Sequence, residues 1–303
     1  MYHSHRICRT QESSSSQEPY APQPKNPRTT TDIPPQNRGI GRAICDSILT
    51  KPNIAPLKLF AASRSGDNLG LTSSEGGDRQ VLYPKLDITD HASIAAFAGE
   101  VKRHGEVDVL INNAGVNLDN QYGLENARRT LDVNYRGTVE MCRTFIPLLA
   151  PNGRIVNLSS VGSLLKPYSA ALQARFRHPQ NSFADLDALA DEFLQTIPAR
   201  SESSSGFGGP GRSYSVSKAL LNAATFLLAR ENPSYLINCC CPGWIATDMG
   251  RLVGSRTVQP PKTPEEGARI PVRLALGGLG GVTGRYWAND SIRGKGEGSV
   301  QEW

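Results

Sequence analysis

The sequence has no apolar run long enough to cross a membrane, and no apolar segment follows its N-terminal basic residues as a secretory signal requires. These absences make a membrane partner unexpected and favour a cytoplasmic location. The chain also lacks a basic run: Lys and Arg exceed Asp and Glu by only 5 among 303 residues, and the excess is spread along the sequence. Nucleic acid is therefore not an expected partner.

Cysteine is scarce, with 6 in the whole chain, and none shows the paired spacing of a metal site. Cys239, Cys240 and Cys241 are consecutive in a predicted strand, where alternate side chains point to opposite faces. We therefore favour buried apolar thiols over metal ligands and expect no metal. So few cysteines in a long chain also fit a reducing compartment.

The segment 1–36 has almost no apolar periodicity and is rich in Ser, Pro, Gln and Arg. Such a composition buries too little apolar surface to offset the entropy of ordering, so we expect a disordered or non-native tail. A mitochondrial transit peptide is the alternative, favoured by Arg and Ser but opposed by Glu12, Glu18 and many prolines.

From residue 37 to residue 303, short β-type runs alternate with helical patterns, which is typical of βαβ units. We predict a single α/β domain with a doubly wound parallel sheet and an atypical or missing first strand. The strand candidates are 57–62, 80–86, 107–112, 154–159, 235–240 and 285–288. Three helices are expected between them: one from an Asp90 cap to before Gly105, one over about 125–149, and one over 214–230.

The connection 161–213 is much longer than a strand-to-helix turn needs, and it contains a helix of its own. Ser182 can cap that helix with Asp185 three residues later. The Gly/Ser-rich stretch 201–211 then reads as a flexible return. Two interpretations stay open: a surface insertion without a role, or a wall over a substrate site.

A Tyr and a Lys four residues apart, Tyr214 and Lys218, fall on one face of the third predicted helix. Their phenol and ammonium can share a site suited to proton transfer to a carbonyl oxygen. The motifs that precede them, in order, are Asn112-Asn113-Ala114-Gly115, Asn134 and Ser159-Ser160. With this ordered set the chain resembles the short-chain dehydrogenase/reductase family. Its carbonyl reductase branch is indicated by Trp244 after Pro-Gly, by Lys262-Thr-Pro-Glu-Glu-Gly-Ala268 and by the ending Gln301-Glu302-Trp303.

The resemblance implies four catalytic residues: Asn134, Ser160, Tyr214 and Lys218. Tyr214 would protonate the substrate carbonyl as NADPH delivers hydride, with nearby positive charge from Lys218 and the nicotinamide's changing charge lowering the pKa of the phenol. Ser160 would hydrogen-bond the substrate oxygen, and Ser159 is the alternative. Asn134 would bind a water that links Lys218 to solvent. Lys218 would also bind the nicotinamide ribose.

A glycine-rich turn for the cofactor pyrophosphate resembles the second half of the family pattern Thr-Gly-x-x-x-Gly-x-Gly. The matching residues are Asn37, Arg38, Gly39, Ile40 and Gly41. The pattern's first Thr and Gly are replaced by Pro34 and Pro35. Upstream, Pro27 and a row of threonines stand where a central strand should be an apolar run.

Arg64 follows the strand 57–62, at the position where a dinucleotide fold presents the residue that reads the adenosine ribose. An arginine there favours the 2′-phosphate of NADP over the 2′-hydroxyl of NAD, and Arg38 adds a second positive charge. We therefore expect NADPH as cofactor, with surface arginines that bind no ligand as the alternative.

By the same resemblance, further residues contact the cofactor. Asp87 and Ile88 would bind the adenine, Asn113, Ala114 and Gly115 would lie beside the adenosine ribose, and Pro242, Gly243, Ile245 and Thr247 would face the nicotinamide. Trp244 would line the substrate pocket, although a tryptophan in plain core is the alternative.

The sequence thus predicts NADPH-dependent reduction of a ketone, aldehyde or quinone to an alcohol, by a monomer. Relatives of the carbonyl reductase branch have an insertion at 161–213 that blocks the helix face used for oligomerisation. Two rivals stay open. One is a silent or defective member that acts at most as a binding protein, because its first strand and half of its phosphate turn look replaced; the other is a dehydrogenase that oxidises an alcohol.

Overall fold

The computed structural model describes residues 28–32, 39–52, 54, 56–71, 78–253 and 257–303. Within them the chain forms one eight-stranded sheet in the order β3-β2-β1-β4-β5-β6-β7-β8. The strands are β1 (Arg28–Asp32), β2 (Leu57–Ala62), β3 (Arg79–Leu82), β4 (Val107–Asn112), β5 (Leu149–Leu158), β6 (Leu236–Cys240), β7 (Tyr286–Ala288) and β8 (Ser299–Gln301). All neighbours are parallel except β7 and β8, so the predicted doubly wound parallel sheet is confirmed.

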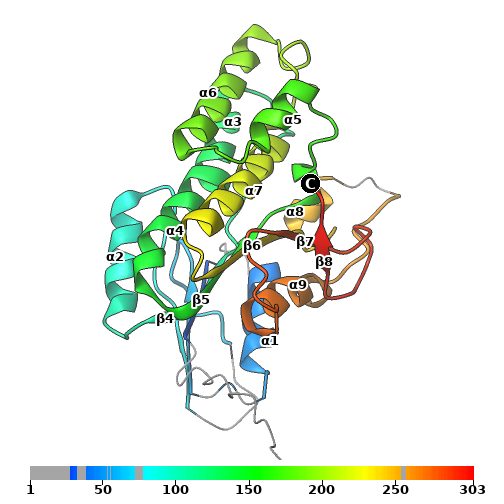
Figure 1. The fold of residues 1–303 in the computed structure, drawn as a ribbon. Helices are drawn as coiled ribbons and strands as arrows, with labels where there is room; N and C mark the ends of the chain where they lie inside the picture. The colour runs from blue at the N-terminus through cyan, green and yellow to red at the C-terminus, as the bar shows by residue number, and fades with distance from the viewer. Residues whose placement is uncertain (1–27, 33–38, 53, 55, 72–77, 254–256) are drawn as a thin grey trace, which may run out of the picture.

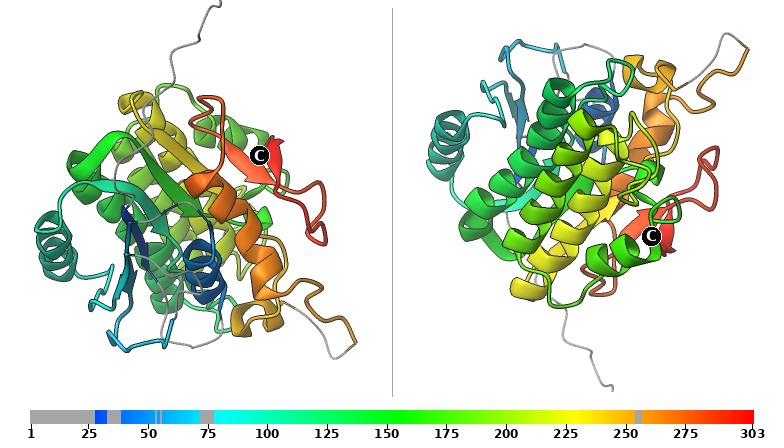
Figure 2. Two further views of the ribbon diagram at one scale, coloured as in Figure 1. Left: turned by 90° about the horizontal axis from the view of Figure 1, so that it is seen from below. Right: turned by 90° about the horizontal axis from the view of Figure 1, so that it is seen from above.

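Helices cover both faces of this sheet (Figures 1 and 2). On one face, α2 (His91–Lys102), α4 (Thr138–Phe145) and α7 (Ser213–Glu231) bury an apolar core against β2, β4, β5 and β6. On the other face, α1 (Ile40–Leu49) and α9 (Pro264–Leu276) lie side by side, although they come from opposite ends of the chain. Cys239 and Cys240 belong to the cores on opposite faces, as the alternation of a strand requires.

Of the two expectations for the first strand, atypical or missing, the structure shows the first, and β1 lies inside the segment 1–36 that was predicted as a tail. Arg28–Asp32 pairs in parallel with β2 along its whole length and with β4 from Thr29 to Thr31, so it completes the centre of the sheet. The physical reason is that threonine is β-branched and adopts the extended backbone readily, while Pro27 precedes the strand instead of interrupting it. Residues 1–27 and 33–36 lie outside the described residues.

The helix predicted over 125–149 is present, but it is not one regular α-helix. It consists of α3 (Leu124–Leu131), a π-helical turn η1 (Asp132–Gly137), α4 and a 3₁₀ turn η2 (Ile146–Leu148). A side chain at Gly137 would clash with the backbone oxygen of Ile88, so glycine permits the π turn to approach the loop that follows β3. Turns of this kind are frequent at functional sites.

The insertion 161–213 is part of the core. It forms η3 (Val161–Ser163), α5 (Ala170–Phe176) and α6 (Phe183–Ala199), and the capping box predicted from Ser182 and Asp185 is present. The apolar side chains of α6 pack against α3 and α7. The expectation of a flexible return over 201–211 is wrong, because Phe207 is fully buried against Phe193 with their ring centroids 5.3 Å apart.

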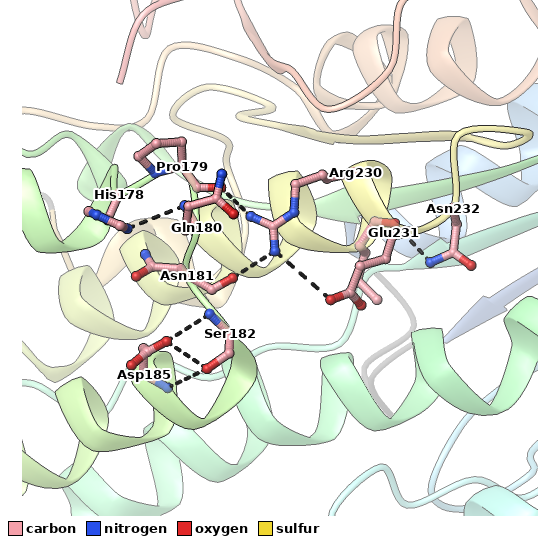
Figure 3. A network of polar contacts seen from close by, with 10 residues as sticks. His178, Pro179, Gln180, Asn181, Ser182, Asp185, Arg230, Glu231 and Asn232 are labelled. Carbon is pink, nitrogen blue, oxygen red and sulfur yellow. Dashed lines mark hydrogen bonds and ion pairs between the residues drawn. The ribbon is translucent and has the colours of Figure 1, made fainter.

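The insertion is also fastened to the C-terminal end of α7 (Figure 3). The Arg230 guanidinium donates to the backbone oxygens of Pro179 and Asn181, the latter at 2.8 Å. The short helix α8 (Asp248–Arg251) follows β6. Within the described part of the chain, no helix is long and apolar enough to span a bilayer.

Candidate active site

The predicted site residues lie after the carboxyl ends of neighbouring parallel strands, which all meet at one edge of the sheet. Asn113 follows β4, Ser159 follows β5 and Cys241 follows β6. In open α/β sheets the ligand site lies outside these strand ends. Helix α7 brings Tyr214 and Lys218 to the same edge, because Lys218 Nζ donates to the backbone oxygen of Leu158 at 2.7 Å.

Tyr214 and Ser160 are brought together: a Cβ placed on Gly162 would lie 3.5 Å from Ser160 Oγ and 3.6 Å from Tyr214 Cε1. Ser160 Oγ accepts from the backbone N–H of Gly162 at 3.1 Å, which orients it. Ser159, the alternative, is buried and donates its hydroxyl to Asn222 Oδ1 at 2.6 Å. The geometry therefore favours Ser160 as the serine available to a substrate.

Burial raises the pKa of Tyr214 to about 12, against a lowering by the Ser160 hydrogen bond, and the neighbouring Cys241 and Asp119 raise it further. The expected lowering by Lys218 and by the changing charge of the nicotinamide concerns the complex with cofactor, and Lys218 alone does not lower the pKa of the phenol here. The reason is that Lys218 Nζ lies 5.8 Å from the centre of the Tyr214 ring and is itself buried, so desolvation outweighs its charge. The phenol is accordingly protonated at neutral pH, as a proton donor must be.

Lys218 is 4% exposed, and burial lowers its pKa to about 8. The nearby Cys240, Cys241 and Cys239 oppose this shift. A lysine with such a pKa exchanges its proton close to neutrality, where an unperturbed lysine stays charged.

Asn134 lies in the π turn and is fully buried. Its amide exchanges two hydrogen bonds of 2.8 Å with the backbone of Val116, and its Nδ2 donates to Ser217 Oγ at 2.9 Å. A Cβ placed on Gly115 would lie 3.2 Å from Asn134 Oδ1 and 3.5 Å from Lys218 Nζ. Asn134 and Lys218 therefore flank the same glycine.

A cavity of 360 Å³ lies beside these residues, between the ends of β2, β3 and β4 and helix α3. Its lining includes five of the residues predicted for the adenosine end of a dinucleotide: Arg64, Asp87, Ile88, Ala114 and Gly115. Arg128 and Arg129 of α3 also line it, and Thr89 donates to Asp87 at 2.7 Å and so helps to lower the pKa of that carboxyl. Asn113 is not part of this lining.

The described part of the glycine-rich turn is the start of α1. Gly39 is the residue that caps this helix, and Ile40 and Gly41 are its first two residues. The space around Gly39 is open, since a Cβ there would meet nothing within 4 Å. The free amides of a helix start can bind an anion at such a place. Asn37 and Arg38 lie outside the described residues.

The loop after β6 is fixed by a buried lysine. Lys262 Nζ donates to Pro242 O at 2.7 Å, and a side chain on Gly243, whose φ is +97°, would lie 2.9 Å from that Nζ. Ile245 pairs with Lys262 through a bridge, and the Thr247 hydroxyl caps α8. Trp244 is half-buried and donates its indole N–H to Gly250 O at 2.7 Å, so it is not a plain core residue.

A second cavity, of 240 Å³, is lined by Gly243 of this loop and by Val161, the residue after Ser160, while Ser160 and Tyr214 are not part of its lining. Val161, Leu164, Cys241, Gly243, Tyr286 and Ile292 are among the residues that line it. Only Gly243 of this set was predicted as a site residue. No local pattern identifies the others, because β7 and its following loop reach the site through tertiary folding alone.

Two further residues were missed. Ser217, inside the Tyr-Lys motif, accepts from Asn134 and donates to Tyr214 O at 2.7 Å. Asp119 binds the N-terminal end of α7. The spacing of Ser217, three residues after Tyr214, could have indicated its contact; Asp119 had no comparable signal.

Comparisons with known proteins agree with this geometry. The family described as short chain dehydrogenase matches residues 35–173. Carbonyl reductase (NADPH) 3 of Rattus norvegicus is 34% identical over 252 residues, which cover 79% of this chain and 88% of that protein. Short-chain dehydrogenase/reductase 1 of Saponaria officinalis is 32% identical over 285 residues, 84% of this chain and 92% of that one.

Among solved structures, salutaridine reductase from Papaver somniferum superposes with a TM-score of 0.73 at 26% identity. The match covers 88% of this chain and 100% of that one. The menthone neomenthol reductase of Mentha piperita gives a TM-score of 0.70 at 26% identity, with 88% and 99% covered.

Proposed function

The chain belongs to the short-chain dehydrogenase/reductase family and is related to the NADPH carbonyl reductases, and from that premise we propose that it reduces a ketone, aldehyde or quinone to an alcohol. The observation that carries the proposal is the convergence of Tyr214, Ser160, Lys218 and Asn134 at one strand edge.

We assign the roles as follows. Tyr214 gives its proton to the carbonyl oxygen, and Ser160 hydrogen-bonds the same oxygen, since both side chains flank Gly162. Lys218 binds the nicotinamide ribose and, with its pKa near 8, returns a proton toward the phenol. Asn134 fixes the backbone beside Gly115 and, through a bound water, links Lys218 to solvent.

The cofactor proposed is NADPH, which when bound supplies the hydride. The residues present fit it: the cavity of 360 Å³ brings Arg64 together with Asp87, Ile88, Ala114 and Gly115. Arg64 is exposed and no ion pair of the described residues occupies it. A guanidinium without a carboxylate partner suits a phosphate.

The second cavity supports a place for the carbonyl compound, because it adjoins Ser160 through Val161 and the nicotinamide loop through Gly243. Its mixture of apolar and polar lining residues does not select one carbonyl compound. Cytoplasmic location stays a prediction.

The rival of a defective member rests on a first strand and half of a phosphate turn that look replaced. The pairing of β1 with β2 and β4 weighs against the first of these two grounds. The second ground is that Pro34 and Pro35 replace the first Thr and Gly of the phosphate turn. These two residues lie outside the described residues, and their effect on NADPH binding is tested below.

The direct test follows NADPH absorbance while the purified chain is given a panel of ketones, aldehydes and quinones. We expect NADPH loss with at least one compound, and a quench or shift of NADPH fluorescence without any. A fluorescence change without turnover of any compound in the panel would favour a binding protein. If neither NADPH loss nor a fluorescence change is observed, the proposal is rejected.

A further inference from the structure

We propose that Asp119 is a positioning residue for Tyr214: its carboxylate caps helix α7 from a separate loop and fixes the backbone that carries the phenol. The inference rests on the proposed function, because it gives Asp119 a part in the same reaction. Asp119 lies in the loop after β4, well away from Tyr214 in the sequence.

Helix α7 needs this external cap. Its N-cap residue is Arg212, whose side chain has no acceptor and makes no capping hydrogen bond. Helices α2 and α9 are capped by their own N-cap side chains, Asp90 and Thr263. The first amides of a helix have no partner within it, and Tyr214 contributes one of them.

Asp119 supplies what Arg212 cannot. Its Oδ1 accepts from the Tyr214 backbone N–H at 3.1 Å and its Oδ2 accepts from the same N–H at 3.3 Å. The Ser213 hydroxyl donates to Asp119 Oδ1 as well. A carboxylate at a helix start is also favoured by the helix dipole.

The cap closes a ring of contacts around Tyr214. At the other end of the same loop, Val116 exchanges two hydrogen bonds with Asn134. Asn134 donates to Ser217 Oγ at 2.9 Å, and Ser217 donates to Tyr214 O at 2.7 Å. The backbone N–H of Tyr214 is therefore bonded to the loop 116–119 directly, and its C=O is connected to the same loop through Ser217 and Asn134. These contacts fix the position of the phenol relative to Asn134.

The charge of Asp119 can be separated from its capping. Burial raises the pKa of Asp119, while the Ser213 and Tyr214 hydrogen bonds and Arg212 lower it; the phenol of Tyr168 is the other titratable neighbour. Its charge is one cause of the raised pKa of Tyr214, which also faces Ser160, Cys241 and Lys218. An uncharged acceptor would keep the cap and remove the charge.

The test compares Asp119→Asn with Asp119→Ala. Asn keeps a side-chain oxygen acceptor, whereas Ala removes it. We expect Asp119→Ala to lower kcat about 10- to 100-fold, because small displacements of a reacting group are costly, with the Kd for NADPH within about twofold of the parent. Asp119→Asn should keep kcat within about threefold of the parent value. The pKa seen in its pH profile of kcat should be lower than that of the parent, because the charge of Asp119 helps to raise the pKa of Tyr214.

Asp90→Ala is the matched control, since it deletes the cap of α2, where Asp90 accepts from Ala92 N at 2.9 Å. It should lower the melting temperature as much as Asp119→Ala does and leave kcat unchanged. An Asp119→Ala kcat within threefold of the parent would overturn the inference. So would an Asp119→Asn variant as impaired as the alanine variant, or an Asp90→Ala variant with the same loss of kcat.

A failed proposed function would be recognised separately, because the parent chain would then reduce no carbonyl compound. Hydrogen exchange of the first α7 amides decides the capping without turnover. Faster exchange in Asp119→Ala but not in Asp119→Asn supports Asp119 as the cap. Equal exchange in the parent and both variants rejects it.

Discussion

The two halves of the carboxyl edge of the sheet are built in different ways. The catalytic half, around β5, β6 and α7, is a polar network in which the buried Asn134, Ser217 and Lys218 make hydrogen bonds of 2.7 to 2.9 Å to one another or to backbone oxygens, among them that of the half-buried Tyr214. The adenosine half, around β2, β3 and α3, presents exposed arginines around an open cavity.

This difference indicates where precision is needed. Proton transfer depends on a few tenths of an ångström, so its groups are fixed in advance by buried partners whose loss would leave polar atoms unsatisfied. A nucleotide is recognised through several separate contacts, and exposed side chains can adjust to it. Substitutions in the catalytic half should therefore change kcat, and substitutions in the adenosine half should change the Kd for the nucleotide.

The largest effect is expected from Tyr214→Phe, which deletes only the phenolic hydroxyl. We expect kcat to fall about 10²- to 10⁴-fold, the usual contribution of a general acid, with NADPH affinity and melting temperature nearly unchanged. Steady-state kinetics and fluorescence titration measure these quantities. A variant that keeps a third of the parent activity would remove Tyr214 from the role of acid.

The next effect concerns stability at alkaline pH. The folded-state pKa of Lys218 is about 8 and its ordinary value is 10.5, so the unfolded chain binds more protons between these values. The free energy of unfolding of the parent, relative to Lys218→Met, should rise by about 2 to 3 kcal/mol from pH 8 to pH 10. Denaturant titrations at both pH values check this; parallel pH dependences would contradict a buried, depressed lysine.

A third change tests the altered turn of the adenosine half. In the double variant Pro34→Thr and Pro35→Gly, two backbone N–H groups return and the family pattern is complete ahead of Gly39. One hydrogen bond to a charged phosphate corresponds to about tenfold to a hundredfold in affinity, so we expect the Kd for NADPH to fall about thirtyfold. If the parent already binds at micromolar Kd and the variant binds no better, the prolines do not impair the site.

A fourth change is Arg64→Asp, which reverses the charge at the edge of the adenosine cavity. We expect the Kd for NADPH to rise about tenfold and the Kd for NADH to change little, because only NADPH carries the 2′-phosphate. Arg103→Asp, at the exposed C-cap of α2 and outside the lining of this cavity, is the matched control. Equal losses for both nucleotides would contradict the assignment of Arg64.

The last prediction concerns the oligomeric state of the unmodified chain, for which we expect no association. Helix α6 covers α3 and α7, and Arg230 fastens the insertion to the end of α7, so the face that relatives pair is occupied. Light scattering at micromolar concentration should give the mass of one chain, 32.8 kDa. A stable dimer or tetramer would mean that association uses another surface.

Much of the fold could be predicted from the sequence because its signals are local. Strands 57–62 and 107–112 have apolar runs bounded by turn residues, and Asp90 and Ser182 start helices where their side chains cap them. Strand β1 could not be predicted this way, since Arg28–Asp32 has no apolar run and becomes a strand by pairing between β2 and β4. Tertiary pairing here overrides the composition of the segment.

The site was predictable where its residues belong to one short motif, as Tyr214 and Lys218 do. It was not predictable where its residues are distant in the sequence and meet only in the tertiary structure. The sequence shows that a lysine is near Tyr214, but not how strongly the surroundings of the phenol raise its pKa. Asp119 was missed for a related reason: its partner is distant along the chain, and no spacing rule connects them.

The π turn at Asp132–Gly137 has a consequence for the tolerance of this chain to deletions. A π turn contains one residue more than the α-helical turn it replaces, so the loss of a single residue there leaves a continuous α-helix that the backbone accepts. Each residue of an α-helix advances the chain by about 100° around the axis, and the π turn absorbs the advance of its extra residue, so the segments before and after the deletion would keep the directions they face now. Such a shortened chain would fold with an unbroken helix while Asn134 no longer pointed at both Val116 and Ser217.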